Sequence, residues 1–433
     1  MRIVGVMGGL GKWGSGLIGA AAVICLAGDA FPAGHHRGGK PARHRANAAA
    51  SSGEEAGASV AVQPLALNQI HTFEGKPAPF ALLARSEMLA DAKTGTVLYS
   101  FNEHTKTQPA SLAKIMTFYV TLDALSAGKV SLDTMVTVSE KAWRLSMDQS
   151  VSKMFLEVGS RVAVRDLLYG LMVSSGNDAA MALAEYLGGS SDAFVAMMND
   201  QCNKLGLKET HFGSPDGLPV EGQYTTASDM VKLARIVVER HPEALTYTAA
   251  KEFTFHGIVQ RNWNTLLIYD SRVNGMKTGH VAEAGFHLVA TANSQGLFLT
   301  SALMGAANAE KRRTETEKLL DWAFRTFVTV TPQWEGVLPR AMRVYEGNIL
   351  STAIGPAREP AITLARGEEN QIKLIGSLRS KYLVAPFEKR AVVGDLTVMR
   401  GDKAVDSIPI VTQSAAQRGR FLHVIGDKFR LLL

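Results

Sequence analysis

A serine and a lysine three residues apart, Ser111 and Lys114, stand at the front of an amphipathic run that predicts a helix over 112–125. Three residues is nearly one helical turn, so the hydroxyl and the amine are expected on one helix face. Serine is a poor nucleophile until a base accepts its proton, and a partly desolvated lysine can be neutral enough to do this. The pair therefore predicts nucleophilic acyl chemistry.

Two triplets further along the chain could complete such a site. Ser175-Gly176-Asn177 lies between two helical patterns, so its hydroxyl and carboxamide would share a connecting loop, where they could relay a proton and hold a peptide amide. Lys277-Thr278-Gly279 precedes a predicted strand, and a lysine and a hydroxyl at a strand edge can bind a carboxylate. Taken alone, the first triplet is more typical of an ordinary turn than of a catalytic site.

Second copies of two of these patterns show how little each one proves by itself. Ser150 and Lys153 repeat the Ser-x-x-Lys spacing in a polar stretch that does not enter a helix, so they are interpreted as surface residues. Lys93-Thr94-Gly95 repeats the Lys-Thr-Gly triplet between two predicted strands and is interpreted as a hairpin turn.

The order and spacing of the three patterns carry more information than any one of them. Ser-x-x-Lys is followed after about 60 residues by Ser-x-Asn and after about 100 more by Lys-Thr-Gly. In this the sequence resembles the D-alanyl-D-alanine carboxypeptidases, serine peptidases of the penicillin-binding protein and serine β-lactamase superfamily. The resemblance runs from about residue 80 to the C-terminus and includes the stretches 109–114, 174–179, 252–255 and 275–280.

The resemblance implies a role for each matching residue and a reaction that needs no metal or organic cofactor. Ser111 would be the acylated nucleophile and Lys114 its general base, while Ser175 would help to pass the proton to the leaving amine. The implied substrate-binding residues are Asn177, which would orient the peptide, Lys277, Thr278 and Gly279 at the terminal carboxylate, His280, and Arg312, which would help to recognise the carboxylate.

The chain departs from the family pattern just ahead of Lys277. That region is one residue shorter than in the relatives, and Trp263 stands where a basic residue is usual. Substrate contacts on this side are therefore not carried over from the family.

Two alternatives to a carboxypeptidase share the same residues. A serine β-lactamase would use the same three motifs, but class A enzymes need a further glutamate, commonly in a Glu-x-x-Leu-Asn segment, and the sequence contains none. A non-catalytic, wall-associated scaffold of the same fold has no physical need for the intact set of Ser111, Lys114, Ser175 and Lys277. Labelled penicillin separates the three: a carboxypeptidase stays labelled, a β-lactamase turns the label over rapidly, and a scaffold is not labelled.

The periodicities predict an α+β fold of the penicillin-binding protein and β-lactamase kind, in which helices flank an antiparallel sheet. Strands are expected over 86–92, 96–101, 286–292 and 297–304, with order beginning near residue 80. Helices are expected over 164–173, 179–187, 193–205 and 230–239, the last with a cap at Thr226. This catalytic domain is assigned to residues 76–332, and a small all-β domain to residues 333–413.

Composition and charge exclude several classes of protein. Of the 433 residues, 46% are hydrophobic and 20% charged, which excludes a wholly disordered chain and a polytopic membrane protein. The net charge of +6 is concentrated at the ends, because residues 1–50 carry +5, residues 414–433 carry +3, and the remainder carries −2. This distribution argues against a nucleic-acid partner and indicates membrane targeting at both termini.

The N-terminal segment predicts export. Sixteen uncharged residues separate Lys12 from Asp29, too few for a spanning helix but typical of a signal peptide, assigned to residues 1–30; a buried helix or a short uncleaved anchor is the alternative. Residues 31–75 are assigned to a disordered linker. After cleavage Cys202 is the remaining cysteine, so no intramolecular disulfide is expected.

The last twenty residues, 414–433, predict an amphipathic segment that attaches to a membrane surface; a last β-strand or a core helix is the alternative. The resulting expectation is a periplasmic enzyme, peripherally attached to the inner membrane. It would act on peptidoglycan stem peptides ending in D-Ala-D-Ala and would be acylated by β-lactam antibiotics.

Overall fold

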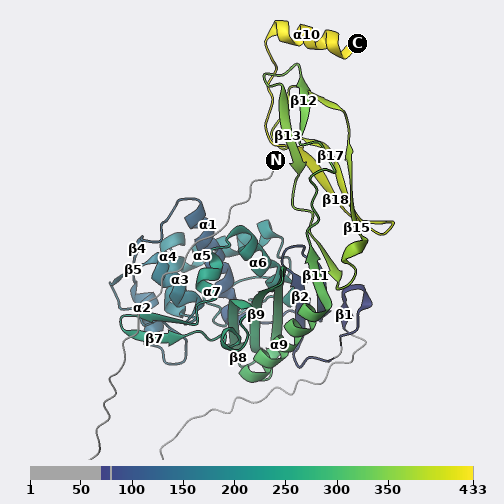
Figure 1. The fold of residues 1–433 in the computed structure, drawn as a ribbon. Coiled ribbons are helices and arrows are strands. Elements are labelled where there is room, and N and C mark those ends of the chain that lie inside the picture. Colours follow the sequence, from purple (N-terminus) through teal and green to yellow (C-terminus); the bar gives the residue numbers. More distant parts are fainter. Residues whose placement is uncertain (1–69, 79, 433) are drawn as a thin grey trace, which may run out of the picture. The chain divides into compact units, whose positions relative to one another are not determined.

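Six antiparallel strands form the sheet that carries the site, in the order β1-β3-β2-β10-β9-β8 (Figure 1). The computed structural model describes residues 70–78 and 80–432, so the predicted signal peptide and most of the predicted linker lie outside the described residues. The strands are β1 (His71–Thr72), β2 (Ser86–Asp91), β3 (Val97–Phe101), β8 (Val273–Val281), β9 (Gly285–Ser294) and β10 (Leu297–Ala306).

Helices cover this sheet, most of them inserted between β3 and β8. They are α1 (Ala113–Ser126), α2 (Glu140–Met147), α3 (Val164–Met172), α4 (Asn177–Gly188), α5 (Ser191–Leu205), α6 (Ala227–Arg240), α7 (Ala244–Thr248), α8 (Leu266–Tyr269) and α9 (Ala309–Thr326). A short 3-10 helix, η3 (Ala110–Leu112), leads into α1. Two two-stranded sheets complete this part: β4 (Met135–Thr137) with β5 (Arg161–Ala163), and β6 (Glu252–Phe255) with β7 (Ile258–Arg261).

The sheet separates two apolar cores. Helix α9 packs on β9 and β10, and its Leu319 and Leu320 join Leu89 and Leu299 of the sheet in one buried cluster. Helix α6 packs on β2 and β10 in a second cluster, together with α1, α3, α4 and α5. The predicted α+β class with helices flanking an antiparallel sheet is confirmed.

Polar side chains cap the starts of α2, α5, α6 and α9. The predicted cap of α6 is confirmed, because Thr226 accepts a hydrogen bond from the backbone N–H of Asp229. The Asp229 carboxylate in turn accepts from the backbone N–H of Glu209 at 2.8 Å.

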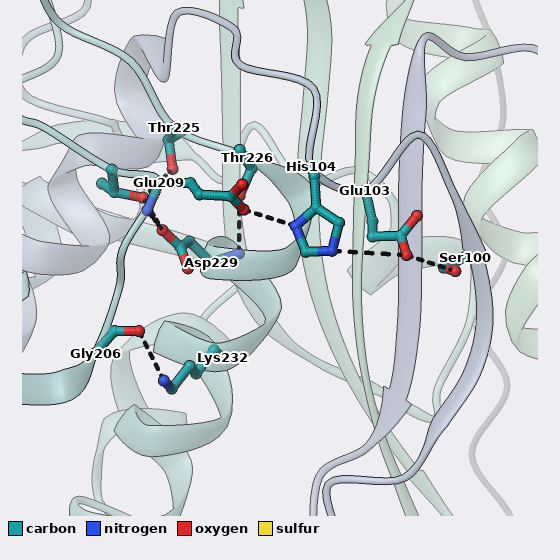
Figure 2. Close-up of polar contacts among 10 residues, drawn as sticks. Ser100, Glu103, His104, Gly206, Glu209, Thr225, Thr226, Asp229 and Lys232 are labelled. Atoms are coloured by element: carbon teal, nitrogen blue, oxygen red, sulfur yellow. Dashed lines mark hydrogen bonds and ion pairs between the residues drawn. The ribbon is translucent and has the colours of Figure 1, made fainter.

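Figure 2 shows this group of residues, with His104 between Glu209, 2.6 Å away, and Glu103.

The C-terminal part is mostly β and ends in a helix. Strand β11 pairs with β14, and the other strands form a sheet in the order β15-β17-β18-β13-β12-β16. The elements are β11 (Phe327–Val330), β12 (Ala341–Tyr345), β13 (Ser351–Pro356), β14 (Ile362–Ala365), β15 (Ile372–Leu378), β16 (Tyr382–Val384), β17 (Val392–Arg400), β18 (Lys403–Thr412) and α10 (Phe421–Leu432). Two further 3-10 turns are η2 (Phe73–Gly75) and η4 (Glu369–Gln371).

Two sequence-based boundaries differ from the structure. The predicted linker ends too late, because His71–Thr72 pairs with β3 and Phe73 packs on the buried cluster under α9, which orders the chain ahead of residue 76. The Lys277-Thr278-Gly279 triplet was expected before a strand, but it lies inside β8, where it pairs with β9. The described part of the chain contains no helix that is both long and apolar enough to cross a membrane.

Candidate active site

Ser111 lies in η3, immediately before α1, and its hydroxyl faces the amine of Lys114. Lys114 Nζ donates a hydrogen bond to Ser111 Oγ at 3.0 Å, so the predicted pairing of the two side chains across one helical turn is present. The entry into the helix is tight, since a Cβ at Gly217 would lie 1.8 Å from the carbonyl oxygen of Ala110. Gly217 also has φ +84°, a conformation that favours glycine.

Lys114 is fully buried and holds its amine in a ring of oxygen acceptors. Besides Ser111 Oγ, Nζ donates to Asn177 Oδ1 at 2.5 Å and to the carbonyl oxygen of Asp216 at 2.7 Å. Burial lowers the pKa of Lys114 to about 8, against the opposing charges of Asp216 and Asp178. About one tenth of the amine is therefore neutral at pH 7, which is the form that can accept a proton.

The loop between α3 and α4 brings Ser175 and Asn177 to the same place. Ser175 is buried and has φ +59°, an unusual conformation for a residue with a side chain. Ser152 braces the loop from the other side, because its hydroxyl donates to the Ser175 carbonyl at 2.8 Å and its carbonyl accepts from the Asn177 N–H at 2.9 Å. The expected serine thus lies on a braced loop, while the carboxamide lies in the first turn of α4, where it bonds to Lys114.

The third triplet lies on β8, which is an edge strand of the sheet. Lys277 is buried, and its Nζ donates to the carbonyl oxygen of Thr278 at 3.0 Å. Burial, with the charges of Lys114 and Arg312, holds its pKa well below the ordinary value. Gly279 lies against the serine segment, since a Cβ there would meet the carbonyl oxygen of Pro109 at 3.2 Å. This glycine lets β8 approach η3 closely.

A cavity of about 440 Å³ opens over these residues. Six of the nine predicted site residues line it: Ser111, Ser175, Thr278, Gly279, His280 and Arg312. The other three, Lys114, Asn177 and Lys277, are not among its lining residues; all three are buried, and two of them are joined by the Lys114–Asn177 hydrogen bond. Among the described lining residues there is no carboxylate, so the cavity suits an anionic group.

His280 and Arg312 also line this cavity. The His280 ring stacks on Phe286 with ring centres 3.9 Å apart, and burial and the charge of Arg312 lower its pKa. Arg312 extends from the first turn of α9 and donates to the carbonyl oxygen of Trp263 at 3.2 Å. Burial lowers the pKa of Arg312 to about 10, so it stays cationic at neutral pH.

Sequence reasoning missed a buried carboxylate that supports the site from behind. Asp178 accepts hydrogen bonds from the backbone N–H groups of Met154 and Leu156 and from the hydroxyl of Ser146. It therefore fixes the loop that carries Ser152 against the start of α4. The only signal in the sequence was that Asp178 directly follows Asn177 in a stretch resembling the family.

Comparison with known proteins agrees with this geometry. Residues 72–308 match the family model described as D-alanyl-D-alanine carboxypeptidase, and residues 327–418 match the C-terminal domain of penicillin-binding protein 5. The chain belongs to the D-alanyl-D-alanine carboxypeptidase family. The predicted family and the predicted enzyme class, a serine-type D-Ala-D-Ala carboxypeptidase, are confirmed.

The similarity extends over most of the chain. It is 39% identical to the D-alanyl-D-alanine carboxypeptidase DacC of Escherichia coli (strain K12) over 79% of this chain and 87% of the relative. It is 38% identical to DacA of the same organism over 81% of this chain and 87% of the relative. The crystal structure of penicillin binding protein 5 from Haemophilus influenzae superimposes with a TM-score of 0.69 at 36% identity, over 79% of this chain and 100% of that one.

Proposed function

We propose that Ser111 is the nucleophile of this carboxypeptidase and that it removes the terminal D-Ala from peptidoglycan stem peptides. The observation that carries the proposal is the 3.0 Å hydrogen bond between Ser111 Oγ and the buried Lys114 Nζ. A lysine whose pKa is lowered to about 8 can take the serine proton near neutral pH, which an ordinary surface lysine cannot do.

Acylation would proceed in two proton-coupled steps. Ser111 Oγ attacks the carbonyl carbon of the penultimate D-Ala while Lys114 accepts the hydroxyl proton. Backbone N–H groups, one of them at Ser111, would stabilise the negative oxygen of the tetrahedral intermediate. Ser175 then relays the proton to the leaving nitrogen, the peptide bond breaks, and free D-Ala departs. Water later attacks the acyl-serine, so the shortened peptide gains the hydroxyl and Ser111 regains its proton.

The terminal carboxylate would be held on the opposite side of the cavity. The Thr278 hydroxyl and the Arg312 guanidinium line the cavity there, and the buried Lys277 lies directly before Thr278 on β8. A cationic pocket without a facing carboxylate favours substrates with a free anionic end. Asn177 would orient the peptide amide, and His280 would close the cavity beside Arg312.

The experiment that tests this function measures D-Ala release from a pentapeptide ending in D-Ala-D-Ala, with the wild type and Ser111→Ala in parallel. We expect release by the wild type and none by the variant. Labelled penicillin gives an independent readout, since a persistent acyl-enzyme should form on the wild type alone. Rapid turnover of the label would instead identify a β-lactamase, and a protein that is never labelled would be a scaffold.

We also propose that the enzyme is exported to the periplasm and held at the inner membrane by α10. Helix α10 supports this, because Phe421 and Leu422 are 76% and 82% exposed, the exposed Arg420 directly precedes them, and Arg430 is exposed further along the helix. Exposed apolar side chains next to cations suit an anionic membrane surface. Deleting residues 418–433 should release the mature protein from membranes and leave peptide cleavage intact. A truncated protein that still sediments with membranes would contradict the proposal.

A further inference from the structure

A second hollow of about 590 Å³ adjoins the active-site cavity. The two share a wall, made of Val151, Ser152, Trp263, Ala309 and Arg312. Ser111 lines only the first cavity, whereas Ser174, Phe155 and Arg261 line only the second. The second hollow therefore borders the cavity of the reactive serine, next to Arg312.

The shared wall is dominated by an exposed indole. Trp263 is 57% exposed, although tryptophan is among the side chains that lose most by contact with water. Its Nε1 donates to the carbonyl oxygen of Ser174 at 3.1 Å, and its own carbonyl accepts from Arg312. The ring is thus tied to the loop of Ser175, and the backbone of Trp263 is bonded to Arg312.

Two asparagines hold the backbone on either side of this tryptophan. The side chain of Asn262 donates to the carbonyl oxygen of Ala250 at 2.9 Å, and that of Asn264 donates to the carbonyl oxygen of Gly275 at 3.0 Å. Both asparagine side chains are buried. Trp263 is therefore presented to solvent from a fixed backbone, which reduces the entropy lost when a ligand packs on it.

Phe155 supplies a second exposed aromatic ring at the hollow. It is 43% exposed and has φ +70°, a left-handed conformation that is unfavourable for a phenylalanine. The backbone N–H groups of its two neighbours, Met154 and Leu156, both bond to Asp178, which holds the turn in this conformation. Strain that is maintained in order to expose an apolar ring is a reason to look for a ligand there.

The hollow lies on the side of the departing amino acid. Arg312, which we propose to bind the terminal carboxylate, lines both cavities, and Ser174 of the hollow directly precedes Ser175, which we propose to protonate the leaving amine. The Cα of the terminal residue must lie between these two groups. The side chain of the terminal residue would then lie close to the hollow, which Arg312 and Ser174 line.

We infer that the hollow is a subsite for the side chain of the terminal D-amino acid, and that the enzyme releases large apolar D-residues as well as D-Ala. The inference rests on the proposed function and names a wider class of leaving group for the same reaction. Trp263 provides apolar contact area in the hollow, and the basic residues Lys153, Arg261 and Arg312 in the same lining disfavour a cationic side chain. The bond broken and the water consumed are unchanged.

The test compares peptides that differ only in the last residue: D-Ala-D-Ala, D-Ala-D-Leu and D-Ala-D-Phe. For the wild type we expect kcat/KM for release of D-Leu and D-Phe within about tenfold of that for D-Ala, with the freed amino acid identified by chiral chromatography. In Trp263→Arg and in Phe155→Ala, the ratio of D-Phe to D-Ala release should fall about tenfold, because the lost contact is made only by the larger residue.

Ile268→Ala is the matched control. Ile268 is 61% exposed and apolar but lines neither cavity, so this variant should keep the wild-type ratio. A wild type that releases D-Ala but neither D-Leu nor D-Phe would overturn the inference and leave the proposed function standing. A ratio unaffected by Trp263→Arg would overturn it as well. A wild type that releases no D-amino acid from any peptide would instead overturn the proposed function.

Discussion

Two sets of ionisable side chains are buried in this protein, and burial acts on them in opposite directions. At the active site it lowers the pKa of Lys114 to about 8. In the core under α9 it raises the pKa of Glu87 well above 4.5, and the neighbouring charge of Glu315 raises it further. In both places the low-dielectric interior disfavours the charged form.

The two sets differ in what surrounds them. Lys114 has three oxygen acceptors around its amine and lies behind a cavity lined by Ser111. Both carboxyl oxygens of Glu87, by contrast, have no hydrogen-bond partner among the described residues, and the same holds for Oη of Tyr99. A shifted pKa therefore marks burial, and it becomes a catalytic property only where the group is hydrogen-bonded to a nucleophile that a substrate can reach.

The largest effect should follow from removing the lysine amine. Lys114→Met keeps the length and apolar stem of the side chain but removes the base, so the rate of acylation by labelled penicillin should fall about 10²–10⁴-fold. Stopped-flow or quenched labelling measures this rate, and circular dichroism checks that the variant is folded.

Lys232→Met is the matched control for that change. The Lys232 amine also donates to a backbone carbonyl, that of Gly206 at 2.8 Å, but this lysine lies outside the site (Figure 2). Its acylation rate should stay within about twofold of the wild type. A folded Lys114→Met protein that is labelled as fast as the wild type would rule out Lys114 as the base.

The next effect is the pH dependence of acylation. Only neutral Lys114 accepts the serine proton, and with a pKa of about 8 its neutral fraction rises from about one hundredth at pH 6 to about one half at pH 8. The apparent second-order rate constant for penicillin should therefore increase about fiftyfold over this interval and level off above it. A profile that is flat between pH 6 and 8 would contradict the assignment of the active proton acceptor.

Substitution of the buried Glu87 should change the stability of the protein and not its rate of acylation. Glu87→Gln replaces a carboxyl group that titrates with an amide that does not. The variant therefore lacks the pH dependence of stability that the raised pKa of Glu87 causes. Because the folded pKa of Glu87 is raised, the wild type has its full stability below pH 4.5 and loses some as pH rises through the raised value. At pH 8 the variant should be more stable by about 1 kcal/mol, and near pH 4 the difference should vanish. Urea unfolding at both pH values measures this.

Asp178→Asn provides the opposite case, since this buried carboxylate is fully hydrogen-bonded. The amide has one acceptor oxygen in place of two, so donors from Met154, Leu156 or Ser146 would be left unpaired. The expected loss is about 1–3 kcal/mol at neutral pH. If Glu87→Gln destabilised the protein as much as Asp178→Asn does, hydrogen bonding would not be what distinguishes these two buried carboxyl groups.

The sequence predicted the parts of the site that lie within one turn or one triplet. Ser111 and Lys114 share a helical face because their spacing forces it, and Thr226 caps α6 because its hydroxyl reaches only its own next turn. The α+β class followed from periodicity in the same way. These features depend on local geometry, which a single sequence contains.

The remaining features depend on chain segments that meet only after folding. Asp178 supports a loop more than twenty residues earlier in the chain, and Gly217 is required by the carbonyl oxygen of Ala110, over a hundred residues away. The early start of the sheet at His71–Thr72 was missed because two residues give no periodicity. The sequence shows Trp263 as a departure from the family pattern, but the exposure of its ring and the hollow that it lines depend on the tertiary structure.

The smallest effect concerns an ionisable group that is neither buried nor catalytic. His104 lies on the surface, where its hydrogen bond to Glu209 at 2.6 Å raises its pKa above 6.5 (Figure 2). The pair contributes fully below pH 6.5 and is lost as pH rises through the raised value. Because His104 is largely exposed, solvent screens the interaction, and His104→Gln should cost about 0.5 kcal/mol at pH 5.5 and nothing measurable at pH 9.

A double-mutant cycle with Glu209→Gln isolates this pair from the backbone contacts around it. The backbone N–H of Glu209 donates to the Asp229 carboxylate, so that contact is retained in every variant of the cycle. The coupling energy at pH 5.5 should shrink when the salt concentration is raised to 1 M, where the Debye length is about 3 Å. A coupling above about 2 kcal/mol that persisted in high salt would mean that surface exposure does not weaken this pair. Exposed and buried ionisable groups would then not differ in the strength of their interactions at the His104–Glu209 pair.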